Sequence, residues 1–292
     1  MTLNILVGAD PEVFVRKVGK KQFQSAHGLI VGDKKNPQKV NMGAVQVDGM
    51  ALEFNIDPAK DEAEFVRNIT GVMKIMSEMV PDYELVPVPV ANFTQRVMDA
   101  APPEALELGC DPDFNAWNNG EANPRPNGAV NFRTGAGHVH IGWTNGVDVA
   151  DPGHKEACIM AAKQLDFYLG LSSLIYDKDT KRRTMYGAQG AFRPKPYGVE
   201  YRVLSNAWLQ SEELIAWVYR TTVKGIQDLF DGKPAYNQYE DLMAAAMKSK
   251  KPNMYHVRYI LDRLGVEPPP GFKKGGNLYD GNGGYQPIEK AA

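Results

Sequence analysis

Hydrophobic and polar positions alternate along several short stretches of the chain, which is the period of a β-strand with one buried face. These stretches are 3–15, 23–31, 44–56, 83–90, 128–143 and 199–204. Apolar side chains recur three and four positions apart elsewhere, which predicts helices, at 61–80, 155–176, 211–230, 239–248 and 254–264. Runs of strands with helices inserted between them predict an α+β fold, with a largely antiparallel β-sheet and helices packed on its outer face.

Two of these elements carry further local signals. The 61–80 helix has Asp61, Glu62 and Glu64 in its first turn, where the helix dipole favours acids, and Pro81 ends it. The strand over 44–56 is interrupted by Asp48-Gly49, a tight-turn dipeptide. This stretch is therefore either a hairpin or a bent strand, and the sequence leaves both open.

Length and composition limit the classes of protein that the chain can represent. Its 292 residues are 43% hydrophobic and 23% charged, and we expect one domain over 1–265 followed by a Gly- and Pro-rich tail over 266–292. A net charge of −2 disfavours a nucleic-acid or anionic-membrane surface. We interpret the lysine clusters as solvated turns; they are Lys17, Lys20, Lys21, Lys34, Lys35 and Lys39.

Cysteine content and hydropathy indicate the compartment. The two cysteines, Cys110 and Cys158, provide neither a disulfide framework nor a cysteine metal site. The first residues resemble a strand, without the features of a signal peptide. No stretch approaches the roughly 20 apolar residues needed to cross a bilayer. These features predict a cytoplasmic protein.

Four stretches place two polar or ionisable side chains two residues apart. Because side chains at i and i+2 of a strand share a face, each pair should project together, with Val13, Phe54, Val139 and Tyr201 turned away. Burying such a cluster is costly unless a counter-charge neutralises it. The pairs are Asp10 and Glu12, Glu53 and Asn55, His138 and His140, and Glu200 and Arg202.

The residue types in these pairs indicate a metal and a phosphate. Carboxylates with an imidazole suit Mg²⁺ or Mn²⁺ better than Zn²⁺. The basic, glycine-containing segment over 177–198 adds arginines, which match phosphate oxygens bidentately. Walker A, Gly-x-Gly-x-x-Gly and Gly-x-Ser-x-Gly motifs do not occur in suitable positions, so phosphates would be held by metals and arginines.

The order of these motifs is familiar. Gly8-Ala9-Asp10-Pro11-Glu12, then Asp48-Gly49 with Glu53, then Gly137–Gly142 and then Tyr197–Arg202 resemble the phage-type COOH–NH2 ligases, or amidoligases. These belong to the glutamine synthetase and glutamate–cysteine ligase superfamily. The resemblance covers roughly residues 3–209, and it implies a glutamine synthetase-like catalytic sheet within a single amidoligase domain.

The resemblance also implies roles for individual residues. It assigns Glu53, Arg193 and Arg202 to catalysis, and it leaves open which arginine contacts the γ-phosphate. Asp111 or Asp113 could take the proton from the attacking amine. The implied metal ligands are Asp10, Glu12, Asp48, Glu53, His138 and Glu200. The residues implied on the nucleotide side are Arg182, Arg183, Arg193, Lys195 and His140.

The implied activity depends on ATP and on Mg²⁺ or Mn²⁺. It joins a small-molecule or peptide carboxylate to an amine through an acyl phosphate, in the cytoplasm (of the host, if the protein is phage-encoded), without nucleic-acid or membrane partners; a homo-oligomer is compatible with it. Two alternatives stay open. One is a metal-dependent hydrolase that uses the His138-Val139-His140 strand, and the other is a non-catalytic protein that retains the fold.

Overall fold

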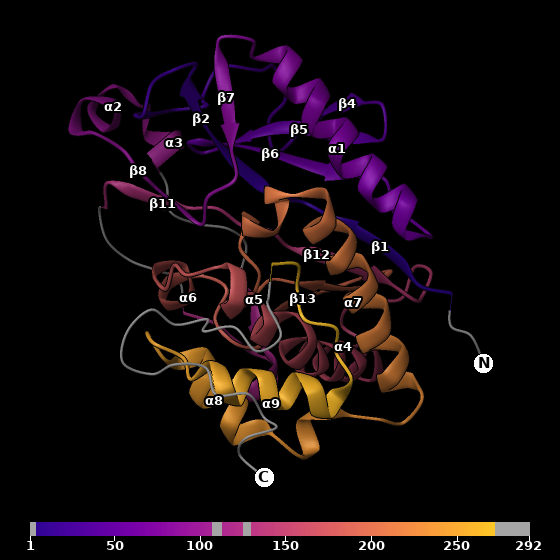
Figure 1. Ribbon diagram of the computed structural model, residues 1–292. Helices are drawn as coiled ribbons and strands as arrows, with labels where there is room; N and C mark the ends of the chain where they lie inside the picture. The colour runs from indigo at the N-terminus through magenta and orange to yellow at the C-terminus, as the bar shows by residue number, and fades with distance from the viewer. Residues whose placement is uncertain (1–3, 107–112, 125–129, 272–292) are drawn as a thin grey trace.

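The computed structural model (Figure 1) describes residues 4–106, 113–124 and 130–271, and within them the strands form two main sheets and a short ribbon. The first sheet has the order β1 (Leu6–Ala9), β12 (Val139–Gly142), β14 (Gly198–Tyr201), β13 (Ala191–Lys195), β9 (Phe114–Asn115) and β10 (Glu121–Ala122). The second has the order β3 (Phe23–Gln24), β2 (Glu12–Lys17), β6 (Ala51–Ile56), β5 (Gly43–Asp48) and β4 (Gln38–Val40), and β7 (Tyr83–Val86) also pairs with β2. The ribbon pairs β8 (Val90–Asn92) with β11 (Phe132–Thr134).

Neighbouring strands in these sheets run antiparallel, so the predicted α+β fold with a largely antiparallel sheet is confirmed. The chain passes from the first sheet to the second at Asp10-Pro11, between β1 and β2. The expectation that Asp10 and Glu12 share one strand is therefore wrong. Pro11 has no backbone N–H with which to continue a strand ladder, and its carbonyl instead accepts the N–H of Phe54.

Helices cover one face of each main sheet (Figure 1). α4 (Pro152–Leu165) packs on β13 and β14, and α7 (Glu212–Phe230) packs on β1 and on α1 (Glu62–Met79), which covers β5 and β6. Between α4 and α5 (Leu171–Tyr176), the residues Asp166–Gly170 form a turn of π-helix. The remaining helices are α2 (Gln95–Ala100), α3 (Pro103–Leu106), α6 (Lys181–Met185), α8 (Glu240–Lys248) and α9 (Met254–Leu264), with 3₁₀ turns at Ala116–Asn118, Asn206–Gln210 and Ala235–Asn237.

The predicted helices are present with small shifts at their ends. In α1, the Asp61 side chain caps the first turn by accepting the N–H of Glu64, and Phe65, Ile69 and Val72 are buried. Ser211 caps α7 in the same way through the N–H of Leu214. Burial of each large apolar side chain contributes about 1.5–3 kcal/mol. Burial of the apolar stripes seen in the sequence therefore holds these helices against the sheets.

The strand predictions needed more revision. Residues 44–56 form the β5–β6 hairpin, with Gly49 at its turn in the left-handed region (φ 57°), which decides between the two alternatives. The 83–90 stretch divides into β7 and β8, and the 128–143 stretch contains β11 and β12. The basic segment over 177–198, expected to be a loop, contains α6 and β13.

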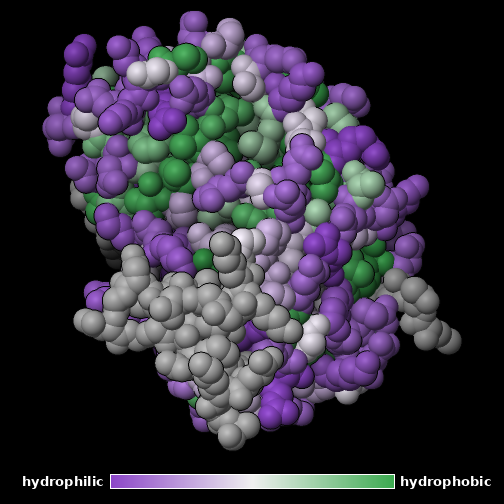
Figure 2. Space-filling view, viewed as in Figure 1, coloured by the Kyte–Doolittle hydropathy of each residue, from purple (hydrophilic) through white to green (hydrophobic). Residues whose placement is uncertain are grey.

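A smaller apolar cluster lies beside the main core, where β2 faces the ribbon. Phe14, Met50, Ala91 and Phe93 are buried there, below α2 and α3. Figure 2 shows hydrophobic side chains gathered on this part of the surface, in the region of β2, β7 and β8. In the part of the chain that the structure describes, no helix has the length and apolar character needed to span a membrane.

Candidate active site

Charged side chains cross the first sheet on the face turned away from its helices. His140, Glu200 and Arg193 are direct neighbours across β12, β14 and β13. His138 and Arg202 lie two positions along on the same face, because alternate residues of a strand share a face. The intervening apolar residues, among them Val139, Val199 and Tyr201, are fully buried on the helical side. The predicted division of the His138–His140 and Glu200–Arg202 strands into a charged and an apolar face is therefore confirmed.

Asp10 lies between the two histidines. Its Oδ1 is 3.2 Å from Nδ1 of His138 and 3.0 Å from Nε2 of His140. Burial and the nearby Arg202 guanidinium lower the pKa of His138 to about 4, so this imidazole is neutral at pH 7. Burial would also lower the pKa of His140, but Asp10 outweighs it and raises that pKa. The Asp10 carboxylate thus contacts both imidazoles, and it favours the protonated form of His140 more than that of His138.

Glu200 is fully buried and surrounded by basic groups. Its Oε2 is 2.9 Å from Nζ of Lys195 and 3.2 Å from Nη1 of Arg193, and its Oε1 pairs with Nη1 of Arg202. Burial and the charge of Asp10 would raise the pKa of Glu200, but Arg202 and the histidines together lower it to about 2. Glu200 therefore stays ionised, and it holds three basic side chains together.

Arg202 has a second carboxylate partner, Asp113, which directly precedes β9. Nε of Arg202 lies 3.2 Å from Oδ2 of Asp113, whose Oδ1 accepts a hydrogen bond from Nδ2 of Asn123. Asp113 is therefore engaged as an orienting partner of Arg202 in this state. Asp111, the other residue considered for the amine proton, lies outside the described residues.

Acids gather beside this basic group, on the second sheet. Glu12 and Glu53 are opposite each other across β2 and β6, and Asp48 ends β5. Burial, followed by the charge of Asp48, raises the pKa of Glu12 to about 7. Burial and the charges of Asp10, Glu12 and Asp48 raise the pKa of Glu53 well above its usual value, although Nε2 of Gln46 donates to its Oε2 at 2.8 Å. Asn55, expected beside Glu53, is exposed.

One lysine partly neutralises these acids. Nζ of Lys34 lies 2.7 Å from Oδ1 of Asp48. Lys34 and its neighbour Lys35 are both exposed in a turn, as predicted, but Lys34 has in addition this contact with an acid of the site. Sequence spacing could not find the contact, because the segment around Lys34 reaches Asp48 only through the fold.

The arrangement of acids fits a divalent cation. Glu12 and Glu53 are half-buried, and desolvation, followed by the neighbouring like charges, raises the pKa of each. A cation would relieve the repulsion between these charges. Single donor atoms of Asp10, His140 and Glu200 also lie within 4.8 Å of one another. Oxygen donors with an imidazole suit Mg²⁺ or Mn²⁺. Since Glu200 already pairs with three basic groups, the Glu12, Asp48 and Glu53 group has the stronger demand for a cation.

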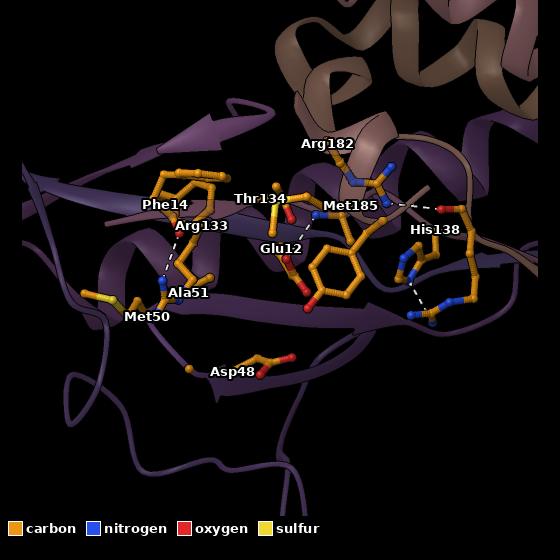
Figure 3. Close-up of a pocket in the computed structure, with 15 residues that line it drawn as sticks. Glu12, Phe14, Asp48, Met50, Ala51, Arg133, Thr134, His138, Arg182 and Met185 are labelled. Atoms are coloured by element: carbon orange, nitrogen blue, oxygen red, sulfur yellow. Dashed lines mark hydrogen bonds between the residues drawn. The ribbon is translucent and has the colours of Figure 1, made fainter. Parts of the chain in front are cut away.

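An open pocket of about 100 Å³ connects the two groups (Figure 3). In this view Glu12, Thr134 and Met185 lie near its centre and Asp48 lies across from them. His138 marks one end, and Phe14, Met50, Ala51 and Arg133 surround the other. A ligand in this pocket would therefore meet acids, basic groups and an apolar wall together.

The arginines of α6 are placed differently from one another. Arg182 is buried and lines the pocket, and its guanidinium donates to the carbonyls of Val203, at 2.6 Å, and Arg202, at 3.1 Å. Burial lowers the pKa of Arg182 to about 10. Arg183 points elsewhere, with Nη1 3.7 Å from Oδ2 of Asp177. Of the two, Arg182 is therefore the one near the acids.

Two glycines before β12, Gly135 and Gly137, leave room for the close approach of the segment at Ser205 and Asn206. A Cβ on Gly137 would lie 2.2 Å from the carbonyl oxygen of Ser205, and one on Gly135 would lie 2.3 Å from Nδ2 of Asn206. Nδ2 of Asn206 in turn donates to the carbonyl of Glu12 at 2.7 Å. These glycines let the segment after β14 pack closely and fix the start of β2.

The positions of Arg193 and Tyr197 follow from a turn signal in the sequence. Residues 195–198 read Lys-Pro-Tyr-Gly, a turn signal between two strands, and the β13–β14 hairpin there pairs Lys195 with Gly198 and Arg193 with Glu200. The hydroxyl of Tyr197 in that turn is 2.5 Å from Nδ1 of His140. Recognising the hairpin would have placed Arg193 against Glu200.

Comparison with known families gives one match. Residues 125–251 match the family described as phage phiEco32-like COOH.NH2 ligase-type 2, which confirms the resemblance to phage-type amidoligases. The matched stretch contains β12, β13 and β14, and thus His138, His140, Arg193, Glu200 and Arg202. No curated protein matches the chain.

Proposed function

We propose that this chain, which matches the phage-type COOH–NH2 ligase family over residues 125–251, is an ATP- and Mg²⁺-dependent ligase that joins a carboxylate to an amine. The family description supports the joining of a carboxyl and an amino group. The dependence on ATP, the divalent metal and the acyl-phosphate route are our proposal. The reaction would take place in a cytosol, which supplies both ATP and Mg²⁺.

The observation that carries the proposal is the separation of charge on one face of the two sheets. Glu12, Asp48 and Glu53 crowd together at one side. Arg193 and Lys195 lie beside Arg202 at the other, held by Glu200. A nucleotide triphosphate with its divalent cation has the complementary pattern, a cation next to an anion. Phosphoryl transfer depends mainly on such positioning and charge stabilisation.

The proposed reaction has two chemical steps. An oxygen of the substrate carboxylate attacks the γ-phosphorus of ATP, the bond to the β-phosphate oxygen breaks, and an acyl phosphate and ADP form. The amine nitrogen then attacks the acyl carbon, the bond to the phosphate oxygen breaks, and an amide and inorganic phosphate leave, with one proton lost from the amine.

The chain's own residues have distinct parts in this scheme. Arg202, with Arg193 and Lys195, would contact the transferred phosphoryl group, and Asp113 orients Arg202 through its Nε. Arg182 would neutralise charge on the pocket wall beside Glu12. His140 would face the phosphate side, where Asp10 raises its pKa against the effect of burial.

The predicted metal ligands divide between the two sheets. Glu12, Asp48 and Glu53 would hold one cation, and Asp10, His138 and Glu200 would line a second position. Bound metal would supply a Lewis acid that neutralises phosphate charge. Glu53 would link the two positions, because the charge of Asp10 raises its pKa as those of Glu12 and Asp48 do.

A direct test uses hydroxylamine as the amine, since it traps acyl phosphates as hydroxamates. The purified chain is incubated with ATP, Mg²⁺ and the common amino acids as carboxylate donors, and both ADP and hydroxamate are measured. We expect ADP release that requires a carboxylate and Mg²⁺, with hydroxamate formed in equal amount.

Variants then test the assignment of the site. Glu53→Gln and Arg202→Met should each lower the rate by about 10²-fold or more, whereas Glu78→Gln, on the exposed face of α1, should leave it unchanged. ADP release that ignores the carboxylate would identify an ATPase and overturn the proposal. Full activity in Glu53→Gln would overturn the assignment of this residue.

The hydrolase alternative loses its structural basis. A His-x-His strand of an amidohydrolase barrel needs repeated βα units with parallel strands, whereas β12 lies between two antiparallel neighbours. The non-catalytic alternative would be favoured by lost acids, but Asp10, Glu12, Asp48, Glu53 and Glu200 are all retained.

A further inference from the structure

Lys34 is held in place by a rigid turn. Oδ1 of Asp33 accepts the backbone N–H groups of Lys35 and Asn36, each at 2.8 Å, which is an Asx-type turn. The carbonyl of Gly32 accepts the N–H of Val47 at 2.9 Å. Val47 directly precedes Asp48, so the turn that presents Lys34 is tied to the strand that presents its partner.

The turn also packs tightly on β5. A Cβ on Gly32 would lie only 2.3 Å from the carbonyl oxygen of Val45, which no side chain could tolerate without movement of the backbone. The Lys34 side chain therefore starts from a fixed backbone position, although it is itself half exposed. Its contact with Asp48 is a built feature of this loop.

The ammonium of Lys34 acts on the whole acid group. Its hydrogen bond to Asp48, and the charges of Asp48, Glu53 and Glu12, raise the pKa of Lys34 against the effect of burial. Lys34 also lowers the pKa of Glu12. Among the groups facing these acids, Arg182 lies on the pocket wall and is fastened to backbone carbonyls. Lys34 has the freer side chain, with four carbons that can swing.

We propose that Lys34 is the resident counter-cation of the acid group, and that a divalent metal ion must displace it from Asp48 in order to bind. This inference rests on the cation site within the proposed function. A metal ion and an ammonium cannot both occupy the same face of one carboxylate, because like charges a few ångströms apart repel strongly. Once displaced, the Lys34 side chain lies at the edge of the site, available to an anionic ligand.

The experiment compares thermal unfolding of the full-length wild type, Lys34→Met and Lys35→Met in EDTA and across a Mg²⁺ titration without nucleotide. In EDTA, Lys34→Met should unfold about 2 °C or more below the wild type, because the acids lose their counter-charge. Its affinity for Mg²⁺ should rise about fivefold. At saturating Mg²⁺ the difference in Tm should vanish. Lys35→Met, with the same change of side chain one residue away, should match the wild type throughout.

The outcomes separate this inference from the function. If Lys34→Met lowers Tm equally with and without Mg²⁺, then Lys34 has only a structural role, and the inference is wrong while the metal site stands. If Mg²⁺ fails to stabilise the wild type, both the cation site and the inference are wrong. If Lys34→Met lowers Tm in EDTA but not at saturating Mg²⁺, and the protein forms no hydroxamate, the inference holds and the proposed reaction is wrong.

A double variant tests whether the effect of Lys34→Met arises from the pair with Asp48 or from a general disturbance of the fold. In the Asp48→Asn background the ammonium has lost its hydrogen-bonded partner and interacts only with the more distant Glu12 and Glu53, so Lys34→Met should then change Tm in EDTA and Mg²⁺ affinity much less than in the wild-type background. An effect of Lys34→Met as large as in the wild-type background would show that Lys34 acts through some other group, and would overturn the inference.

Discussion

Replacing Glu12 with glutamine should stabilise the metal-free protein at alkaline pH and leave it almost unchanged in acid. Glu12 is half-buried beside Asp48, and its pKa is raised from 4.5 to about 7. In the unfolded chain the same group ionises near 4.5. Folding therefore opposes its ionisation, and the wild type loses stability as the pH rises from the unfolded value through about 7.

The size of the effect follows from the shift. Each unit of pKa corresponds to about 1.4 kcal/mol, so a shift from 4.5 to about 7 corresponds to about 3 kcal/mol once the pH exceeds 7. The Glu12→Gln side chain carries no charge, and its amide oxygen can still accept the N–H of Ala136, which Oε2 of Glu12 accepts at 3.0 Å. The variant should therefore be more stable than the wild type by about 3 kcal/mol at pH 8, and by less than 1 kcal/mol at pH 5.

Urea unfolding at the two pH values, in EDTA, measures both differences. Titrating groups that do not interact with Glu12 affect both proteins alike and cancel in the comparison. Glu53 does interact with it, and because the charge of Glu12 raises the pKa of Glu53, its loss should add to the stability of the variant at pH 8. Adding Mg²⁺ at pH 8 should then stabilise the wild type and have little effect on Glu12→Gln, because the variant lacks one of the proposed ligands. A variant that is less stable than the wild type at pH 8, or a difference that does not depend on pH, would refute the idea that like-charge crowding strains this group.

Three further changes test the rest of the arrangement. Glu200→Gln leaves three basic side chains without their buried carboxylate and should cost about 3 kcal/mol or more in urea unfolding; unchanged stability would contradict the role of Glu200 as their anchor. Gly137→Ala forces a Cβ to 2.2 Å from a carbonyl and should lower Tm markedly, whereas Gly142→Ala, with its nearest neighbour at 3.6 Å, should be tolerated; equal melting of the two would refute the packing argument. At pH 5, Asp166→Asn should lose about 1–3 kcal/mol, measured in the same way, because Trp117 and Tyr201 each donate to one of its oxygens and an amide can accept only one of them. Burial raises the pKa of Asp166 to about 7, so the comparison belongs below that pH; a stable variant there would show that this buried network contributes little.

The helices were predictable because their signals are local. In α1 the cap, the acidic first turn and the apolar stripe all fall within 61–80, and each acts between residues three or four positions apart. The charged face of β12 and β14 was predictable for a similar reason, since alternation along one strand determines which side chains share a face. What could be found from the sequence is the part of the structure that depends on near neighbours.

The change of sheet at Pro11 depends on distant partners. The alternation around Asp10 and Glu12 looks the same whether the strand continues or divides. β1 pairs with β12, while β2 pairs with β6, and these pairings join residues far apart in the chain. The consequence is functional, because the break sends Asp10 toward the histidines and Glu12 toward Glu53, where one continuous strand would have kept them together.

The missed strand β13 has a different cause. Pro194 argues against a central strand, because proline cannot donate to a ladder. β13 nevertheless lies between β14 and β9, but β9 pairs only with Ala191 and Phe192. Pro194 therefore lies beyond the end of β9, where its missing N–H breaks no pairing on that side. An inner strand can therefore contain this proline, because only the β14 side of β13 is paired at that position.

The site holds a protein substitute for each half of its proposed ligand. Lys34 pairs with Asp48 where a cation would bind, and Glu200 pairs with Arg193, Lys195 and Arg202 where a phosphate would bind. A cation alone would reduce the repulsion among the acids, but the basic groups would stay paired with Glu200. An anion alone would have to compete with Glu200 for the basic groups, and the repulsion among the acids would remain. A phosphate that carries its own cation satisfies both groups at once. Since Glu53 senses Asp10 as well as Glu12 and Asp48, the two halves are electrostatically connected, and binding of one component favours the other by the same free energy in both directions. Under the proposed function, the internal ion pairs would therefore give the charge-separated face a preference for the paired ligand over either ion alone.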